Sequence, residues 1–275
     1  MLAKIILGTA NFTQQYGILS SGVPCEEKVK KILELSYENG ISTLDTAFGY
    51  GDIFSVYSNK TLKEFIINTK FSVKDDLKDV YKKLQSLSRY KIDVLMVHDP
   101  QHIEDVDHKK LQSFFIRLKE ENLIRRVGVS VYEECEVHQF ASSVCKVDAI
   151  QLPLNPLNQV FNNKNFKQYV CENNIEIHAR SLFLQGVLLS EDIPRLLMPL
   201  KGIIEELRKE LHSYPSMLSG LLAWAKQQKW VHKWVLGVSN ISDLKKLCKT
   251  TSEKQDGPNI NFCVPAHPLL DPRTW

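Results

Sequence analysis

Four side chains of this sequence carry the groups needed to reduce a carbonyl compound: Asp45, Tyr50, Lys70 and His98. A free tyrosine has a pKa near ~10 and exchanges its proton poorly at neutral pH. A nearby ammonium lowers that pKa, and a carboxylate holds the ammonium in place and charged. We therefore predict Tyr50 as a general acid and Lys70 as the group that lowers its pKa. Asp45 would hold Lys70, and His98 would orient the carbonyl. This chemistry needs no metal ion.

Each of these residues also has a purely structural interpretation. An Asp that ends a strand often caps a helix, a Lys at a strand end usually reaches solvent, and a His before Asp-Pro can bond the turn backbone. However, Asp45, Lys70 and His98 end three consecutive predicted strands. Neighbouring strands lie ~5 Å apart, so these side chains are expected to meet at one edge of a sheet. Tyr50 lies in the loop after Asp45 and would join them.

Short apolar runs rich in Val, Ile and Leu recur along the chain, and most precede a segment with helical periodicity. This alternation is typical of repeated strand–helix units and a parallel sheet. The eight predicted strands are Ile5–Leu7, Ser42–Asp45, Phe65–Lys70, Ile92–His98, Ile124–Ser130, Ala149–Leu152, Ile175–Ala179 and Trp234–Val238. The predicted helices are Glu26–Asn39, Leu77–Leu87, Leu111–Glu121, Cys135–Ser142, Phe166–Asn173, Met198–His212, Met217–Gln228 and Leu244–Lys249, with a shorter helix between Tyr50 and Phe65.

Eight such units in 275 residues predict one α/β domain over residues 1–275. The expected architecture is a closed (β/α)8 TIM barrel, whose usual size is about 250 residues. An open doubly wound sheet is the alternative. The first predicted strand is followed by Gly8–Phe12 rather than by the glycine turn of a Rossmann site, which favours the barrel. In such a barrel the active site lies at the carboxyl ends of the strands.

The composition restricts the class of protein. Charged residues make up 24% of the chain, hydrophobic residues 43%, and the net charge is only +3, so neither a nucleic-acid nor a membrane-surface partner is indicated. No apolar run approaches the ~20 residues of a transmembrane helix, and Met1–Phe12 lacks the features of a signal peptide. The scattered cysteines predict reduced, mostly buried thiols in a cytoplasmic protein. A monomer is the default expectation, with an oligomer left open.

Several separated segments match the motifs of one family in order and spacing. They are Leu7–Ala10, Leu44–Gly51, Thr69–Lys70, Val97–Pro100 and Leu236–Asn240. On these segments, which span nearly the whole chain, the sequence resembles the aldo-keto reductases. The resemblance implies a (β/α)8 barrel that binds NADPH or NADH across its rim and reduces an aldehyde or ketone. It also implies that the four residues named first are the family's catalytic Asp, Tyr, Lys and His.

The same resemblance implies a set of cofactor contacts. Ser130 and Gln151 match residues that hold the nicotinamide carboxamide, while Val131 stands where an Asn often follows that Ser. Arg180 stands where many members stack a Tyr on the nicotinamide ring. Its guanidinium could stack there, or could bond a phosphate or a neighbouring acid. The predicted cofactor contacts are Gly8, Thr9, Ser130, Gln151, Arg180, Ser181, Phe183, Gln185, Gly237, Ser239 and Asn240.

The choice between the two dinucleotides stays open. Residues Gly237–Asn240 are predicted to open a helix whose free N–H groups suit a phosphate. Members selective for NADPH often carry a Lys and an Arg around this turn. Here Gly237 and Asp243 stand in those places, although Lys245 and Lys246 follow. Use of NADH, NADPH or both therefore fits the sequence.

Two functions fit the resemblance. The first is an NAD(P)H-dependent reductase of an aldehyde or ketone, and the alternative is a nicotinamide-binding regulatory subunit with little turnover. The short chain after Gly257 predicts a small lid and an open, polar mouth. The run Arg180–Gly186 resembles that of bacterial members associated with sugar metabolism. A sugar-like carbonyl compound is therefore the expected substrate.

Overall fold

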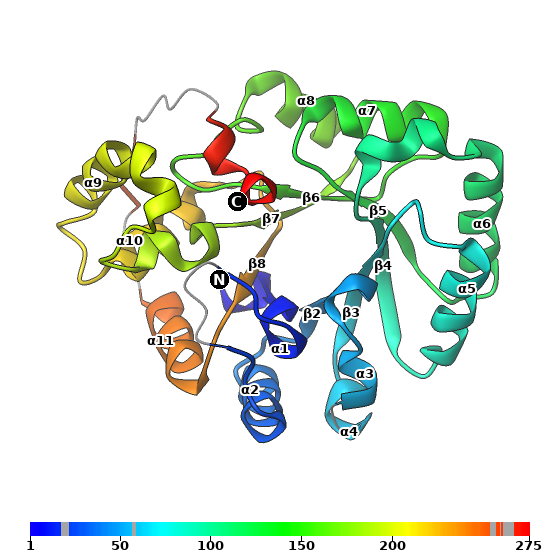
Figure 1. Cartoon of the computed structure of the whole chain (residues 1–275), viewed down its shortest axis with the longest axis horizontal. Coiled ribbons are helices and arrows are strands. Elements are labelled where there is room, and N and C mark those ends of the chain that lie inside the picture. The colour runs from blue at the N-terminus through cyan, green and yellow to red at the C-terminus, as the bar shows by residue number, and fades with distance from the viewer. Residues whose placement is uncertain (18–21, 57–58, 254–256, 259, 261–266) are drawn as a thin grey trace.

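Eight parallel strands close into a barrel in the computed structural model, in the order in which they occur in the chain (Figure 1). The model describes residues 1–17, 22–56, 59–253, 257–258, 260 and 267–275. The strands are β1 (Ile5–Gly8), β2 (Thr43–Asp45), β3 (Ile66–Phe71), β4 (Lys91–Val97), β5 (Arg126–Ser130), β6 (Ala149–Pro153), β7 (Glu176–Arg180) and β8 (Lys233–Gly237). Because β8 pairs with β1, the described sheet has no open edge. All eight predicted strands are confirmed, with ends shifted by one or two residues.

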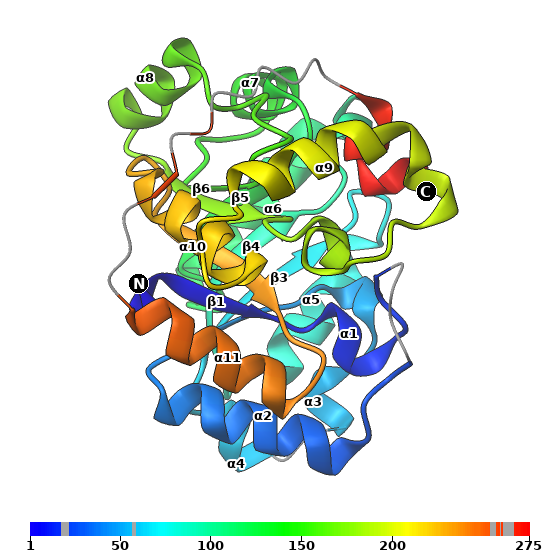
Figure 2. The ribbon, with the colours of Figure 1, turned by 90° about the vertical axis from the view of Figure 1, so that its left-hand side faces the viewer.

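Helices cover the outside of the barrel (Figures 1 and 2). They are α1 (Ala10–Thr13), α2 (Glu26–Glu38), α3 (Ile53–Val56), α4 (Asn59–Leu62), α5 (Leu77–Ser86), α6 (His108–Glu120), α7 (Glu134–Ser143), α8 (Lys164–Glu172), α9 (Lys201–Glu210), α10 (Met217–Gln227) and α11 (Ile241–Ser252). Both views place α2 beside α11, which joins the first and last strand–helix units of the ring. The expected (β/α)8 fold is therefore confirmed.

One predicted helix is wrong in its extent. The helix expected over Met198–His212 is divided into a 3-10 helix, Arg195–Leu200, and the α-helix α9 that follows it. Pro199 lies inside the 3-10 helix. A proline has no N–H and clashes with the preceding turn of an α-helix, so the α-helical ladder begins only after this residue.

The main core lies between the strands and the helices, and a second, smaller one lies inside the barrel. Successive side chains of a strand point to opposite faces, so Leu95 and Val97 pack outward in the main core. Val94, Met96 and Ala149 form a separate cluster. Beside them, a Cβ added to Gly128 would lie 2.8 Å from the carbonyl oxygen of Ala149 and 2.9 Å from Met96 Cγ. Only glycine fits at that point of the interior.

An ion-pair cluster lies at the amino ends of the strands. Arg126 Nη2 lies 2.6 Å from Asp93 Oδ2, and Arg126 Nη1 lies 2.7 Å from Glu176 Oε2. His178 Nε2 lies 2.7 Å from the other oxygen of Glu176. This cluster, which we call the N-terminal cluster (Asp93, Arg126, Glu176 and His178), ties β4, β5 and β7 together at the end of the barrel opposite the predicted site.

Cysteine exposure differs from the expectation. Cys25, Cys135 and Cys171 are exposed and unpaired, because they lie on solvent-facing positions at or in the outer helices. The prediction of mostly buried thiols is therefore wrong for these residues, while Cys263 lies outside the described residues. None of the helices in the described part of the chain is long and apolar enough to cross a membrane.

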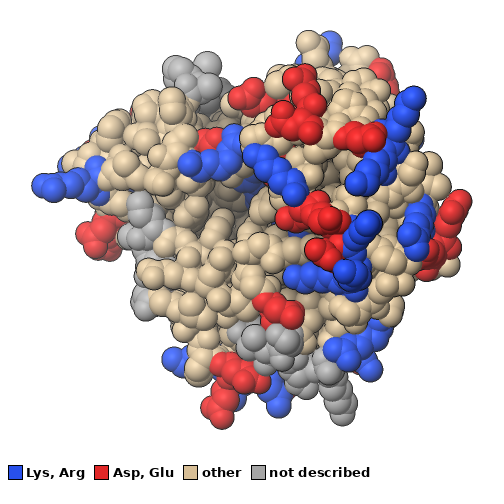
Figure 3. Space-filling model, turned by 45° about the vertical axis from the view of Figure 1, so that its right-hand side comes forward, with Lys and Arg blue, Asp and Glu red and all other residues tan. Residues whose placement is uncertain are grey.

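Charged groups of both signs share the surface. Figure 3 shows Lys and Arg side chains interspersed with Asp and Glu on the face that it presents. This face therefore has no separate basic and acidic regions.

Candidate active site

A buried ion pair stands at the carboxyl ends of the strands. Lys70 Nζ lies 2.6 Å from Asp45 Oδ2 and donates to the carbonyl oxygen of Thr46 at 3.1 Å. Gln151 Nε2 donates to Asp45 Oδ1 at 2.7 Å. Asp45 is only 4% exposed and Lys70 only 1%, so neither caps a helix or reaches solvent. Side chains from β3 and β6 therefore fix the carboxylate of Asp45 on β2. Burial lowers the pKa of Lys70, and the Asp45 carboxylate opposes that change.

Tyr50 and His98 complete the group. Tyr50 ends a 3-10 turn, and Gly51 follows it with φ at +95°, a left-handed conformation that favours glycine. The Tyr50 ring meets the edge of the His98 ring at a centroid distance of 5.7 Å. Lys70 Nζ lies 5.4 Å from the centroid of the Tyr50 ring. The structure thus brings together all four residues named from the sequence.

The pKa of Tyr50 differs from the sequence-based prediction. Burial raises this pKa above that of free tyrosine, the Asp45 carboxylate raises it further, and the Arg180 guanidinium opposes both. The prediction that Lys70 lowers the pKa of Tyr50 is therefore wrong, because the net change is an increase. The reason is that burial penalises the phenolate, while the charge of Lys70 is already paired with Asp45. Tyr50 consequently keeps its proton at neutral pH.

His98 is neutral under the same conditions. Burial lowers its pKa to about 4, and the positive charges of Lys70 and Arg180 act in the same direction. A neutral imidazole carries one N–H donor and one acceptor nitrogen. His98 can therefore donate a hydrogen bond to a carbonyl oxygen without adding a charge.

Asp45 and Tyr50 line a pocket of about 840 Å³, whereas Lys70 and His98 do not line it. This volume falls within the range of about 300–1,000 Å³ that is usual for ligand sites. The predicted cofactor contacts that line it are Gly8, Thr9, Gln151, Arg180, Ser181, Phe183, Gln185, Gly237 and Ser239. The pocket extends from Asp45 and Tyr50 to the helix α11. Among the described residues, no three His, Cys, Asp or Glu side chains form a group that could hold a metal ion.

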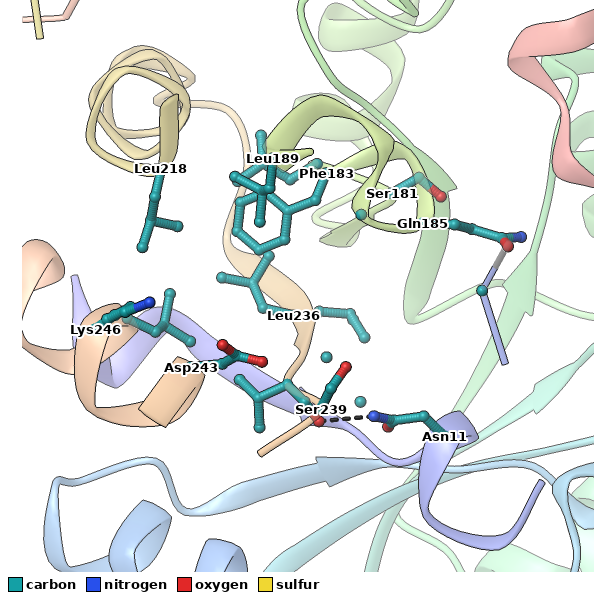
Figure 4. A pocket seen from close by; sticks show the side chains of 18 of the residues that line it. Asn11, Ser181, Phe183, Gln185, Leu189, Leu218, Leu236, Ser239, Asp243 and Lys246 are labelled. Atoms are coloured by element: carbon teal, nitrogen blue, oxygen red, sulfur yellow. Dashed lines mark hydrogen bonds between the residues drawn. The ribbon is translucent and has the colours of Figure 1, made fainter. Parts of the chain in front are cut away.

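Figure 4 shows that the pocket has an apolar and a polar side. Phe183, Leu189 and Leu218 lie on one side, and Asp243 and Lys246 of α11 lie across from them. This arrangement would let the flat, apolar part of a ligand pack on one side while its polar groups meet the other.

The end of β8 is tied to the beginning of the chain. Asn11 Nδ2 donates to the carbonyl oxygen of Val238 at 2.7 Å, which links the segment after β1 with the segment after β8 (Figure 4). This bond holds the polar side of the pocket in place.

Two predicted cofactor contacts do not line the pocket. Ser130 is buried at the end of β5, where its strand register pairs it with Gln151. Asn240 caps α11 instead, since its Oδ1 accepts from the Asp243 N–H at 2.9 Å and its Nδ2 donates to the Asp243 carboxylate at 2.9 Å. The side chain of Asn240 therefore satisfies the helix end rather than facing the cavity.

The loop after β7 has an unusual backbone. Ser181, Leu184 and Gln185 have φ values of 64°, 45° and 53°, in the left-handed region, and Gly186 follows at 93°. A residue with a side chain in that region costs about 1 kcal/mol or more, and such residues cluster at binding sites. Ser181, Gln185 and Gly186 all line the pocket, so this backbone shapes it.

Three residues at the site were not predicted. The Tyr16 ring lies 6.5 Å from the Tyr50 ring. The Tyr132 ring contacts two guanidinium groups, that of Arg180 at 4.1 Å and that of Arg273 at 3.5 Å from its centroid. The position of Tyr132, two residues after the end of β5, could have suggested its presence at the rim. Arg273 is far away in the sequence and gave no such signal.

The end of the chain lies over the barrel opening (Figure 1). Leu270 is buried in a cluster that includes Leu197 and Ile204, and Arg273 forms an ion pair with Asp271 at 2.7 Å. The predicted small lid falls partly on residues 259 and 261–266, which lie outside the described residues. Residues 267–275 contribute Arg273 to the rim of the site.

The sequence model of the Aldo/keto reductase family matches residues 4–255. The chain belongs to the aldo/keto reductase family. Two solved structures are similar to it. The aldo-keto reductase AKR11C1 from Bacillus halodurans, in its holo form, has 18% identity and a TM-score of 0.72, with 91% of this chain and 87% of that chain covered. The glycerol dehydrogenase AKR11B4 from Gluconobacter oxydans has 18% identity and a TM-score of 0.71, with 92% and 87% covered.

At these identities the structural likeness shows the fold alone. No curated protein sequence matches the chain. Membership of the aldo/keto reductase family, taken with the fold, supports an NAD(P)H-dependent oxidoreductase that acts on small carbonyl compounds.

Proposed function

We propose that this aldo/keto reductase reduces a sugar-like aldehyde or ketone, with Tyr50 as the general acid. The observation that carries the proposal is the meeting of Asp45, Tyr50, Lys70 and His98 beside a pocket of about 840 Å³. These four groups, each suited to carbonyl reduction, come from three strand ends and one loop.

Each residue has a role that its surroundings support. The raised pKa of Tyr50 keeps the phenol protonated until a carbonyl oxygen gains electron density and takes the proton. Neutral His98 donates to the same oxygen and orients it. Lys70, held by Asp45, places a positive charge near the Tyr50 ring and favours the phenolate that remains. Gln151 holds the second oxygen of Asp45 and thereby fixes the ion pair.

The pocket residues fit a nicotinamide dinucleotide. The cavity is lined by Tyr50 and also by Lys246 and Lys249 of α11, whose ammonium groups would favour phosphates. When bound, the dinucleotide supplies the hydride. The residues that would hold it are Gly8, Thr9, Gln151, Arg180, Ser181, Phe183, Gln185, Gly237 and Ser239, which line the pocket, whereas Ser130 and Asn240 do not line it. Asp243 would oppose the additional phosphate of NADPH and Lys246 would favour it, so this side of the pocket fits either NADH or NADPH.

Substrate class and location are also proposals. The polar residues around the rim and the naming of one structural relative as a glycerol dehydrogenase support a hydroxylated carbonyl substrate. The scattered cysteine spacing supports a cytoplasmic protein.

The proposal is tested by following NADH and NADPH oxidation with a panel of aldehydes and keto sugars. Replacing Tyr50→Phe removes the proton donor and is expected to lower the rate about 1,000-fold, within the range of general acid catalysis. Tyr37→Phe is the control, because Tyr37 is exposed, does not line the pocket, and its hydroxyl bonds Glu64 at 3.5 Å. Its rate should stay close to that of the wild type.

Three results would contradict the proposal in different ways. Equal rates for the wild type and Tyr50→Phe would exclude Tyr50 as the acid. Dinucleotide binding without turnover of any carbonyl would favour the regulatory subunit. Activity confined to bulky apolar carbonyls would exclude a sugar-like substrate.

A further inference from the structure

Arg180 brings a positive charge to the pocket without a carboxylate to balance it. The other cation beside Tyr50, Lys70, lies 2.6 Å from Asp45 and is neutralised there. Within the described part of the chain, Arg180 forms no ion pair with an Asp or Glu; its hydrogen bonds go to neutral oxygens. A partly buried charge that lacks a partner is costly, and a bound anion would remove that cost.

The guanidinium is held in one orientation with donors to spare. Its Nη2 donates to the carbonyl oxygen of Val131 at 3.3 Å, and its Nη1 donates to Ser181 Oγ at 3.4 Å. One face contacts the Tyr132 ring at 4.1 Å from the centroid. An arginine has five N–H donors, so three remain after these two bonds. Their fork geometry matches the two oxygens of a carboxylate.

The charge also lies near the reacting groups. It lowers the pKa of both Tyr50 and His98, the two residues proposed to contact the carbonyl oxygen. An anion bound to Arg180 would therefore belong to the same small molecule as the carbonyl, or to a group next to it.

We propose that Arg180 determines substrate specificity by binding a carboxylate of the carbonyl substrate, so that the preferred compounds are aldehyde or keto acids. The proposal rests on the proposed reduction and narrows its substrate class. It is compatible with a nicotinamide ring against the guanidinium, because a ring would contact the face while the carboxylate contacts the N–H edge.

Paired substrates that differ in one carboxylate test this directly. We would measure kcat/KM for glyoxylate and glycolaldehyde, and for succinic semialdehyde and butyraldehyde, with wild type and Arg180→Met. The ratio within each pair is the readout, since effects on cofactor binding or on Tyr50 act on both members and cancel. Loss of a charge-assisted bond should lower the preference for the acid about 10- to 100-fold. Arg180→Lys keeps the charge and should restore part of it.

Arg273→Met is the matched control. Arg273 contacts the same Tyr132 ring, but its charge is paired with Asp271 at 2.7 Å. Its replacement should leave the ratio unchanged. An unchanged ratio in Arg180→Met, or an equal fall in both arginine variants, would overturn the proposal.

Binding measurements separate this inference from the proposed reaction. Calorimetric titration with succinate should show binding to the wild type and its loss in Arg180→Met. If the wild type reduces no carbonyl but binds succinate through Arg180, the proposed reaction fails and the carboxylate site stands. If Arg180→Met weakens only NADH and NADPH binding, with succinate binding unaltered, Arg180 serves a cofactor phosphate and the inference is wrong.

Discussion

Charged side chains gather at both ends of the barrel, and the two groups differ in how completely they are paired. In the N-terminal cluster, Arg126 is bonded to Asp93 and Glu176, and His178 Nε2 bonds the second oxygen of Glu176, so both carboxylates face a partner; His178 Nδ1 is buried without a hydrogen-bond partner among the described residues. At the other end, Lys70 is paired with Asp45 and the Tyr50 ring lies against the His98 ring, but Arg180 has no carboxylate partner within the described part of the chain.

The difference separates charges that stabilise the fold from charges that can bind a ligand. A charge that is already paired inside the protein is not available to bind a ligand. A charge without such a partner is available. The same division is general for this barrel, in which the amino ends of the strands serve stability and the carboxyl ends serve catalysis. Variants at each end should therefore affect different measurements.

The largest expected effect is on activity at the carboxyl end. Lys70→Met removes the ammonium beside Tyr50 and leaves the buried Asp45 carboxylate without a balancing positive charge, so kcat/KM should fall about 1,000-fold. Lys82→Met is the matched control, because Lys82 pairs with Asp79 at 3.0 Å on the open surface. Steady-state kinetics measures kcat/KM for both folded variants. Similar activities would show that the buried pair is only structural.

The next effect is on stability at the amino end. Arg126→Met leaves Asp93 and Glu176 without their shared partner, and the free energy of unfolding should fall by about 3 kcal/mol. The activity of the folded protein should not change. Urea unfolding measures the loss, with Arg117→Met as the control, because the Arg117–Glu121 pair is exposed. If Arg126→Met lost activity but not stability, the amino ends of the strands would not serve stability, and the proposed difference between the two ends would be wrong.

A smaller effect on stability is expected from a substitution in the barrel interior, which lies between the two ends. Gly128→Ala would place a Cβ 2.8 Å from the Ala149 carbonyl oxygen, and this overpacking should cost about 1–3 kcal/mol of unfolding free energy. Gly202→Ala, in α9 with nothing within 4 Å, should instead stabilise the protein slightly. Thermal unfolding of both variants compares them. Equal stability would mean that the barrel interior adjusts to a methyl group.

The smallest expected effect is a pH dependence of the free energy of unfolding, which arises from His98 at the carboxyl ends of the strands. The pKa of His98 falls to about 4 in the folded chain, so the unfolded chain binds more protons as the pH drops from 6.5 towards 4. The free energy of unfolding should therefore decrease over that interval. His98→Gln should make the decrease shallower when unfolding is measured at pH 7 and pH 5. The same slope in both proteins would place the pH dependence elsewhere.

The sequence predicted the strands and the three residues at their ends because both depend on local patterns. Alternating apolar and helical segments mark the strands, and a residue directly after a strand must lie at the rim. Asp45, Lys70 and His98 could be found in this way.

Features that depend on tertiary contacts could not be found. Arg126 reads as an ordinary charge before an apolar run, and only the strand register shows that it lies between Asp93 and Glu176. The direction of the Tyr50 pKa depends on how deeply the phenol is buried, which no local pattern reveals. Arg273 reaches Tyr132 only after the barrel closes.

The left-handed backbone at Ser181, Leu184 and Gln185 has a consequence for the evolution and engineering of this protein. This backbone gives the pocket wall its shape, and its conformational cost lowers the free energy of unfolding of the whole protein. Selection for a hardier protein would therefore favour glycine in this loop, at the expense of the defined pocket wall that the loop provides. Heat resistance and ligand discrimination are in direct competition at these three positions.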